Sequence, residues 1–324
     1  MSSNDTTVPL SVNENNFSTQ VSLSPRPSNW TFEIGTYEWQ SPVMLSYRPV
    51  GDPTGLVTFK GSGSPGEIGA ASVLACSPCF TVSQSFVKFR EIAFTPASVE
   101  NPFNEYDNGG SIVAIDATVT ISNCHFTSTV AQGSGGAVFF SYSSTGVIGP
   151  LSMTLSSNKF ENVTAKNGGG GAVYGYLATP TPVEMTDNIF KNALAPSINS
   201  AASVGGAVAI YQGYPRSYDN GEIKVTNNLI INSYGCAYNQ MCNTSSFYIT
   251  HESSKPNFND VENPRVDVSC NERVFGDYSA PYLLCSKFRG YPSDACTKVY
   301  DALSLFPLHN DTIDCSDYDF QPPG

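Results

Sequence analysis

The tetrapeptide GGAV stands at residues 135–138, 170–173 and 205–208, and each copy begins 35 residues after the previous one. A looser copy, GGSI, stands at residues 109–112. Equal spacing of one short block is typical of a chain built from structural units that stack on one another. A glycine pair allows positive φ or a close backbone approach, so each pair is expected to form a corner before a strand. The corner glycines of the three full copies are Gly135, Gly136, Gly170, Gly171, Gly205 and Gly206.

A second pattern precedes each glycine pair. A strand-like segment ends in an apolar anchor residue, and the positions seven and five residues before the anchor are apolar in every copy. Alternation of this kind predicts strands that turn one face toward a core. A fifth such segment has no GGAV block after it. The five anchors are Phe94, Phe126, Phe160, Phe190 and Ile230.

Asparagine stands two residues before the anchor in the last three copies, at Asn158, Asn188 and Asn228. We expect the chain to bend near these residues, because Asn tolerates left-handed geometry and bonds its own backbone. Equivalent residues of stacked coils lie about 4.8 Å apart. The aligned Asn side chains could then hydrogen-bond along a ladder, and the aligned Phe rings could stack inside.

The composition of the repeats separates a β solenoid from a helical array. Helical repeats of this length need helix formers at a spacing of 3.6 residues, whereas these repeats consist of Gly, Ser, Thr, Val and Asn. The sequence therefore predicts an all-β fold, a right-handed, single-stranded parallel β-helix. Loops of variable length, after the anchor and after the GGAV strand, are expected to leave the cylinder.

The repeats are expected to occupy the middle of the chain. The expected divisions are a disordered or loosely attached segment at 1–28, the parallel β-helix at 29–255 with its first coils at 29–84 and the GGAV repeats at about 85–235, and a small Cys-rich C-terminal cap at 256–324. Within the cap, residues 293–306 (SDACTKVYDALSLF) read as a short helix with Ser293 as the N-cap.

Nine cysteines bear on the compartment, because a cytosolic protein rarely keeps so many without metal or redox chemistry. Cys76-Ser-Pro-Cys79 has the CxxC form of redox and zinc sites. There is no second CxxC, so a local disulfide or two packed thiols is expected. Near the C-terminus disulfides are favoured over reduced thiols. The candidates there are Cys236, Cys242, Cys270, Cys285, Cys296 and Cys315.

The charge balance excludes several partners. The formal net charge is -12, with a pI near 4.6, and no basic cluster appears. Nucleic acid and anionic membranes need clustered Lys and Arg, so neither is expected as a partner. No stretch approaches the roughly 18 apolar residues of a membrane helix. Residues 1–20 lack the features of a signal peptide, which leaves a cytoplasmic location as the alternative to an extracellular one.

The central coils carry few acids, and no motif of paired carboxylates appears among them. Those acids are Asp116, Glu161, Glu184, Asp187, Asp219 and Glu222. His125 beside Cys124 is expected at a surface corner rather than acting as a base. The sequence therefore predicts no catalytic, cofactor-binding or metal-binding residues, and no cofactor.

The pairing of GGAV with a Phe-and-Asn motif resembles the repeats of chlamydial polymorphic outer membrane proteins (Pmp type) and of similar surface proteins in some protists. The motifs of that family are GGA(I/L/V) and FxxN, and the resemblance implies a parallel β-helix, related to the pectin-lyase-like folds, that is displayed at the cell surface and implicated in adhesion. The second motif is one residue shorter here, Phe160-Glu161-Asn162 and Phe190-Lys191-Asn192. The resemblance covers roughly residues 85–235.

These observations favour a non-catalytic, adhesin-like protein at the cell surface or secreted, with a protein or glycan partner bound through loops and the solenoid face. A carbohydrate-active enzyme, either a polysaccharide lyase or a glycoside hydrolase of the pectin-lyase-like fold, is the alternative. A structural solenoid segment of a larger protein is a further one. Carboxylates converging in a groove would favour the enzyme. The sequence does not determine the oligomeric state.

Overall fold

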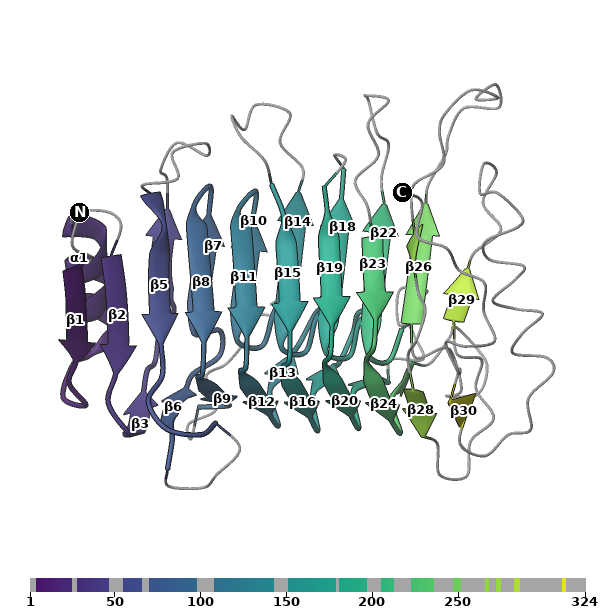
Figure 1. Ribbon diagram of the computed structural model, residues 1–324, viewed down its shortest axis with the longest axis horizontal. Coiled ribbons are helices and arrows are strands. Elements are labelled where there is room, and N and C mark those ends of the chain that lie inside the picture. The colour runs from purple at the N-terminus through teal and green to yellow at the C-terminus, as the bar shows by residue number, and fades with distance from the viewer. Residues whose placement is uncertain are drawn as a thin grey trace.

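The computed structural model of the chain forms a stack of β coils with a short helix at its N-terminal end (Figure 1). The residues that the structure describes are 4–24, 28–46, 55–65, 70–97, 108–142, 151–178, 181–196, 205–212, 223–235, 247–251, 266–267, 272–274, 283–285 and 311–312. Parallel pairing between successive coils confirms an all-β parallel solenoid.

Three long sheets run along the described part of the stack, and one short sheet of four strands accompanies the central coils. Sheet A contains, in order, β1 (Asn4–Val8), β2 (Ser28–Phe32), β5 (Val57–Lys60), β8 (Phe86–Arg90), β11 (Thr118–Ser122), β15 (Met153–Ser156), β19 (Val183–Thr186), β23 (Ile223–Thr226) and β27 (Val266–Asp267). Sheet B contains β3 (Gly35–Glu38), β6 (Ser72–Ala75), β9 (Ala93–Thr95), β12 (His125–Thr127), β16 (Lys159–Glu161), β20 (Ile189–Lys191), β24 (Leu229–Ile231), β28 (Glu272–Val274) and β30 (Asp311–Thr312).

Sheet C closes the coil and lies behind sheet A in the view of Figure 1. It contains β4 (Val43–Ser46), β7 (Phe80–Ser83), β10 (Ile112–Ile115), β14 (Val138–Tyr142), β18 (Val173–Leu177), β22 (Val208–Gln212), β26 (Phe247–His251) and β29 (Leu283–Cys285). A short sheet D, between B and C, contains β13 (Val130–Ala131), β17 (Thr164–Ala165), β21 (Leu194–Ala195) and β25 (Tyr234–Gly235). One central coil therefore runs through β11, β12, β13 and β14.

The predicted anchors form a column of stacked rings inside sheet B. Phe94, Phe126, Phe160 and Phe190 are fully buried. Their successive centroids lie 4.8, 4.8 and 4.9 Å apart, with ring planes within 6° of parallel. Ile230 continues the column in register with Phe190. The apolar positions seven and five residues before the anchors, such as Val119 and Ile121, also point inward.

The asparagines two residues before the anchors form a buried ladder. The Oδ1 atom of Asn188 accepts hydrogen bonds from the backbone N–H of Asn158 at 3.0 Å and from its side-chain amide at 3.0 Å. Asn228 accepts the equivalent pair from Asn188, and Asn158 accepts from the backbone N–H of Cys124. Each side-chain amide also donates to a sheet A carbonyl, that of Leu155 in the case of Asn188. The ladder satisfies polar groups that would otherwise be costly to bury.

The bend predicted near these asparagines falls on the residue that precedes each of them. The residue before each buried Asn, for example Asp187 with φ 58°, takes the left-handed conformation. A second bend follows the anchor at Ser128, Asn162, Asn192 and Asn232, all with positive φ. The buried Asn is therefore retained for its hydrogen bonds, while neighbouring residues make the corners on each side of the sheet B strand.

The glycine pairs form the corner before sheet C, and their two members serve different needs. Gly170 has φ 65°, and Gly135 and Gly205 have φ 70°. At Gly171 a Cβ atom would collide with the carbonyl oxygen of Gly206 in the next coil. The first glycine of each pair therefore provides the positive φ, and the second allows the backbones of neighbouring coils to approach closely.

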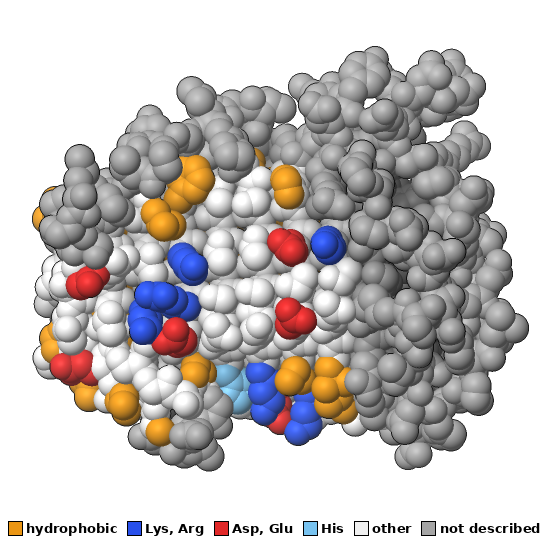
Figure 2. All heavy atoms as spheres, in the orientation of Figure 1, with side chains coloured by type: hydrophobic (Ala, Val, Ile, Leu, Met, Phe, Trp, Pro, Cys, Tyr) orange, Lys and Arg blue, Asp and Glu red, His pale blue; other side chains and the backbone are white. Residues whose placement is uncertain are grey.

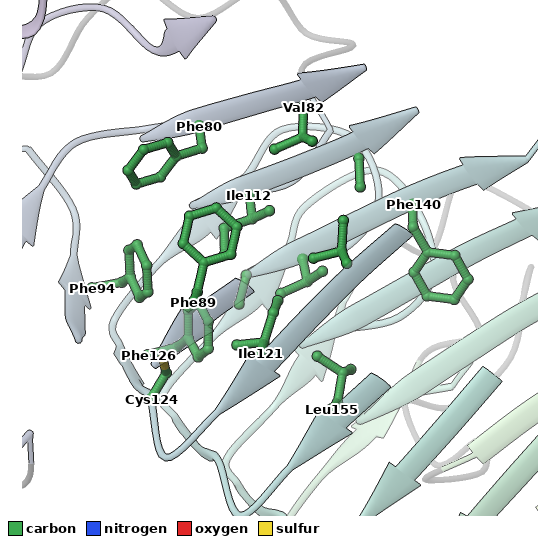
Figure 3. Close-up of a cluster of buried hydrophobic side chains, with 14 of the residues drawn as sticks. Phe80, Val82, Phe89, Phe94, Ile112, Ile121, Cys124, Phe126, Phe140 and Leu155 are labelled. Carbon is green, nitrogen blue, oxygen red and sulfur yellow. The ribbon is translucent and has the colours of Figure 1, made fainter. Parts of the chain in front are cut away.

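Side chains from all three long sheets fill the interior, as Figure 3 shows for Phe80, Phe89 and Phe94. The rings of Phe80 and Phe89 lie 4.8 Å apart. Farther along sheet C, the Phe140 ring occupies the space next to Gly175, where a Cβ atom would collide with it. A large residue on one coil is thus matched by the smallest residue on the next.

The N-terminal segment differs from the loosely attached chain predicted for residues 1–28. Strand β1 pairs with β2 in parallel register, and α1 (Glu14–Leu23) begins at Asn13, whose side chain accepts from the Asn16 N–H at 2.9 Å. Phe17 and Val21, one turn apart, are fully buried. The Phe17 ring contacts those of Trp30, Phe32, Trp39 and Phe59. The helix covers aromatic side chains that the first coils would otherwise leave open.

The C-terminal part continues the parallel pairing past residue 255, the predicted end of the solenoid. Strands β27, β28 and β29 pair in parallel with β23, β24 and β26, and β30 pairs antiparallel with β28. The predicted helix at 293–306 lies outside the described residues.

Replacing Asn188 with Ala tests the ladder. The change leaves the buried N–H of Asn158 without its acceptor, and we expect the free energy of unfolding to fall by about 2–4 kcal/mol. Urea denaturation followed by circular dichroism measures the effect. Asn29→Ala, which removes an exposed side-chain hydrogen bond to Asp5, is the control and is expected to cost less than about 1 kcal/mol. Equal losses in the two variants would contradict the ladder's role.

Candidate functional site

The in-step pairing of the coils arranges the outward side chains in rows, so each sheet presents a surface of its own chemistry. Sheet A, which faces the viewer in Figure 2, is mostly uncoloured polar surface with scattered charges. Its outward residues include several threonines and serines. Among the described side chains, the charged ones are Asp5, Lys60, Lys88, Arg90, Glu184 and Lys224. This mixture of both signs is typical of a solvated face.

Sheet C presents a different surface. From β4 to β22 its strands contain no Asp, Glu, Lys or Arg. One outward row consists of Met44, Thr81, Val113, Phe139, Tyr174 and Ala209. The second consists of Ser46, Ser83, Ile115, Ser141, Tyr176 and Tyr211. In a chain with 44 charged residues among 324 (16 basic and 28 acidic), this face is a local exception.

Four aromatic side chains gather on three neighbouring strands of this face. Phe139, Tyr174, Tyr176 and Tyr211 are all partly exposed. We define these four residues as the aromatic strip. Ile115, 37% exposed, lies on the adjacent strand beside Ser141, and Met44, 50% exposed, lies at the far end of the face. A group of exposed apolar and aromatic side chains on a soluble surface marks an interaction site.

The rings of the strip are held in parallel pairs. The centroids of Phe139 and Tyr174 lie 5.7 Å apart with planes 1° apart, and those of Tyr176 and Tyr211 lie 5.6 Å apart with planes 12° apart. These distances exceed the 4.8–4.9 Å of the buried Phe column. All four rings are also partly exposed.

The inward residues of the same strands hold the strip in place. Val138, Phe140 and Tyr142 of β14, and Val173 and Leu177 of β18, are fully buried. The Tyr142 hydroxyl donates to the Ser152 carbonyl oxygen at 3.0 Å, and burial raises the pKa of that hydroxyl. Because alternate residues are locked in the core, the outward rings are carried on a preorganised platform.

Sheet B carries a compact ionic cluster, seen at the lower edge of Figure 2. Glu161 pairs with Lys159 at 2.8 Å and with Lys191 at 2.7 Å. Hydrogen bonds from these two lysines lower the pKa of the Glu161 carboxyl to about 2. His125 lies beside them, with its Nε2 atom 3.5 Å from Glu161 and 2.9 Å from the Thr127 hydroxyl.

The hydrogen bonds of His125 indicate a structural role for its side chain. Its Nδ1 atom lies 3.0 Å from the Pro65 carbonyl oxygen, so that nitrogen carries the proton and donates. The Thr127–His125 contact has the length of a nucleophile–base pair. The neighbouring carboxylate is, however, engaged by both lysines. We interpret the cluster as an ion-paired network that spans three coils of sheet B. His125 occupies an outward position within β12 instead of the predicted surface corner, and its side chain is 14% exposed.

The acids of the central coils do not converge on one groove in the described part of the chain. Asp116 is buried at the corner before sheet A, with φ 49°. Glu184 is exposed on sheet A, and Asp187 makes a corner. Asp219 and Glu222 lie outside the described residues. Among the residues that are described, no three His, Cys, Asp or Glu side chains are grouped to hold a metal ion.

The cysteines fall into three groups. Cys76 and Cys79 form a disulfide, one of the two arrangements predicted for this CxxC segment, and both are fully buried. Cys124 is a buried free thiol at the end of the asparagine ladder. Of the six candidates for C-terminal disulfides, Cys236, Cys242, Cys270, Cys296 and Cys315 lie outside the described residues. Cys285 belongs to β29, but its side chain is not described.

Comparisons with protein-family models, with curated proteins and with solved structures found no match for this chain. In the part of the chain that is described, no helix has the length and apolar character needed to cross a bilayer.

The aromatic strip was missed by the sequence analysis, although its signal is present in the repeats. The residues predicted after each GGAV block were the inward ones, which begin at its Val. The outward positions, one and three residues after that Val, include Phe139 in one copy, and Tyr174 and Tyr176 in the next. Alternation of exposed and buried positions along a strand would have placed these rings on one outer face.

Glu161→Gln tests the ionic cluster through pH. Because the pKa of this carboxyl is lower in the folded chain than in the unfolded one, its contribution to stability is present above about pH 4.5. It is lost as the pH falls toward about 2. We therefore expect the wild type to exceed Glu161→Gln in urea midpoint at pH 6 and to approach it at pH 2.5. In a Lys159→Gln/Lys191→Gln background this pH-dependent gap should vanish, and an undiminished gap would contradict the assignment.

The Cys124 thiol should be inert in the folded chain. Burial raises the pKa of this thiol to about 12, and its exposed fraction is 2%. Since the thiolate is the reactive species, treatment with iodoacetamide at pH 8.5 should leave Cys124 unmodified until denaturant is added. Peptide mass spectrometry before and after unfolding measures this. Rapid alkylation under native conditions would show that the interior at this corner is open.

Proposed function

We propose that this chain is a non-catalytic, adhesin-like protein that binds a protein or glycan partner through the outer face of sheet C, with the aromatic strip as the main contact. The observation that carries the proposal is the gathering of Phe139, Tyr174, Tyr176 and Tyr211 on a face whose strands carry no charged residue. Aromatic side chains dominate the energetics of binding surfaces, because each buries a large area at a small cost in conformational entropy.

A binding role also explains why four aromatic rings are exposed at positions where polar side chains would serve the fold equally well. Solvated outer positions on sheet A hold Thr, Ser, Lys and Glu, which satisfy the same backbone without exposing apolar area. Holding four rings outward on adjacent coils favours aggregation unless a partner covers them. Neither the packing of the core nor the coil corners needs these outward rings, whereas a binding site does.

The proposal also covers the handedness of the solenoid and its similarity to known β-helices. We take the solenoid to be right-handed and similar to the pectin-lyase-like surface β-helices, including the Pmp-type repeats. A strand followed by a crossover to a parallel strand of the same sheet is right-handed in about 98% of cases. Every coil of sheets A, B and C in the central part of the chain has such a connection.

An extracellular or cell-surface location is part of the same proposal. The Cys76–Cys79 disulfide supports it, because disulfides persist in oxidising compartments and are rare in the cytosol. The acidic character of the chain, with a net charge of -12, disfavours nucleic acid as the partner.

The double variant Tyr174→Ala/Tyr176→Ala tests the proposal. Purified chain is applied to a panel of immobilised glycans and extracellular matrix proteins, including collagen, fibronectin and mucin, and binding is measured by biolayer interferometry. We expect the wild type to bind at least one member of the panel and the double variant to bind it about tenfold or more weakly, as the loss of aromatic hot-spot residues implies.

The matched control is Thr154→Ala/Ser156→Ala, which removes two outward side chains from sheet A. This control should keep wild-type binding. In urea denaturation, both variants should keep the free energy of unfolding of the wild type within about 1 kcal/mol. A panel to which the wild type does not bind, or binding that both variants retain equally, would overturn the proposal.

A further inference from the structure

We propose that the aromatic strip binds an uncharged, linear polysaccharide that runs along the solenoid axis, with its pyranose rings lying against the rings of Phe139, Tyr174, Tyr176 and Tyr211. This inference rests on the proposed function and narrows its partner from a protein or a glycan to one class of ligand.

The first argument is the charge of the face. Between β4 and β22, sheet C offers no cation to pair with a carboxylate or sulfate and no anion to pair with an amine. A charged ligand placed here would lose hydration without gaining a counterion, which is costly. The net charge of -12 adds repulsion toward acidic glycans. A neutral ligand carries neither cost.

The second argument is the repeat. Phe139 is paired with Tyr174, and Tyr176 is paired with Tyr211, in parallel register on strands about 4.8 Å apart. A linear polymer whose units advance by about that distance can present one unit to each coil in turn.

The third argument is the mixture of groups on the face. The four rings are partly exposed, and an exposed aromatic ring packs against the C–H bonds of a sugar ring. Ser141 stands in the same row as Tyr176 and is partly exposed, with Ser83 and Thr81 on β7 farther along. Hydroxyl groups beside apolar rings match the alternation of C–H and O–H groups on an uncharged sugar.

Saccharide binding is measured by isothermal titration calorimetry with the full chain. The neutral probes are cellohexaose, xylohexaose, laminarihexaose and mannohexaose, and the charged probes are hexagalacturonate and a heparin hexasaccharide. We expect at least one neutral probe to bind at least tenfold more tightly than either charged probe. The affinity for that probe should rise from its disaccharide to its tetrasaccharide, as more coils are contacted, and then level off.

Three variants test the contact itself. Tyr176→Ala should weaken binding of the neutral probe about tenfold, whereas Tyr176→Phe, which keeps the ring, should weaken it less than about threefold. Ser141→Lys places a charge in the strip without removing any ring and should weaken neutral binding by a similar factor to Tyr176→Ala. Because Ser141 points outward, this variant keeps the test valid even if the alanine variant folds poorly.

The possible results separate this inference from the proposed function. Tighter binding of a charged probe, or no binding of any neutral probe at millimolar concentration, overturns the inference that the ligand is an uncharged polysaccharide. If a matrix protein nevertheless binds in a manner that depends on Tyr174 and Tyr176, the proposed function stands and its partner is a protein. If no ligand of either kind depends on these tyrosines, both fail.

Discussion

Coil-on-coil register is the constraint on which the rest of the structure depends. Each buried Asn must find its partner one coil away, at Asn158, Asn188 and Asn228, and each anchor Phe must meet the next ring at about 4.8 Å. A shift of one residue would separate each Asn side chain from its partner on the next coil and leave buried polar atoms unpaired. Corners with left-handed residues and glycine pairs keep each strand in that register.

Because the interior fixes the backbone, the outer positions of each sheet are free to carry different chemistry. Sheet A alternates hydroxyl groups with a few charges, and sheet B ties three coils together through His125, Glu161 and the lysines beside it. Sheet C concentrates aromatic rings and excludes charge. A binding surface can therefore be built on one face without altering the residues that hold the coils.

The parallel solenoid could be predicted because its core residues recur at fixed intervals, and Phe126, Phe160 and Phe190 lie in the column that their spacing implied. The bend predicted near each buried Asn is present, but the pattern did not say which residue makes it, since an Asn suits both a corner and a buried ladder. The N-terminal helix was missed because it is mostly polar, and its two buried apolar residues, Phe17 and Val21, are too few to form a clear apolar face in the sequence. The aromatic strip was missed because core patterns direct attention to inward positions.

The central claim is that ligand binding resides on the outer face of sheet C. Nuclear magnetic resonance of the chain, with carbon-13 in its tyrosine rings and threonine methyl groups, tests it most directly during titration with the neutral hexasaccharides. The account predicts shifts or broadening for the rings of Tyr174, Tyr176 and Tyr211, with the methyl groups of Thr120, Thr154 and Thr186 on sheet A unchanged. Changes confined to the sheet A methyl groups, with the three rings unaffected, would contradict it.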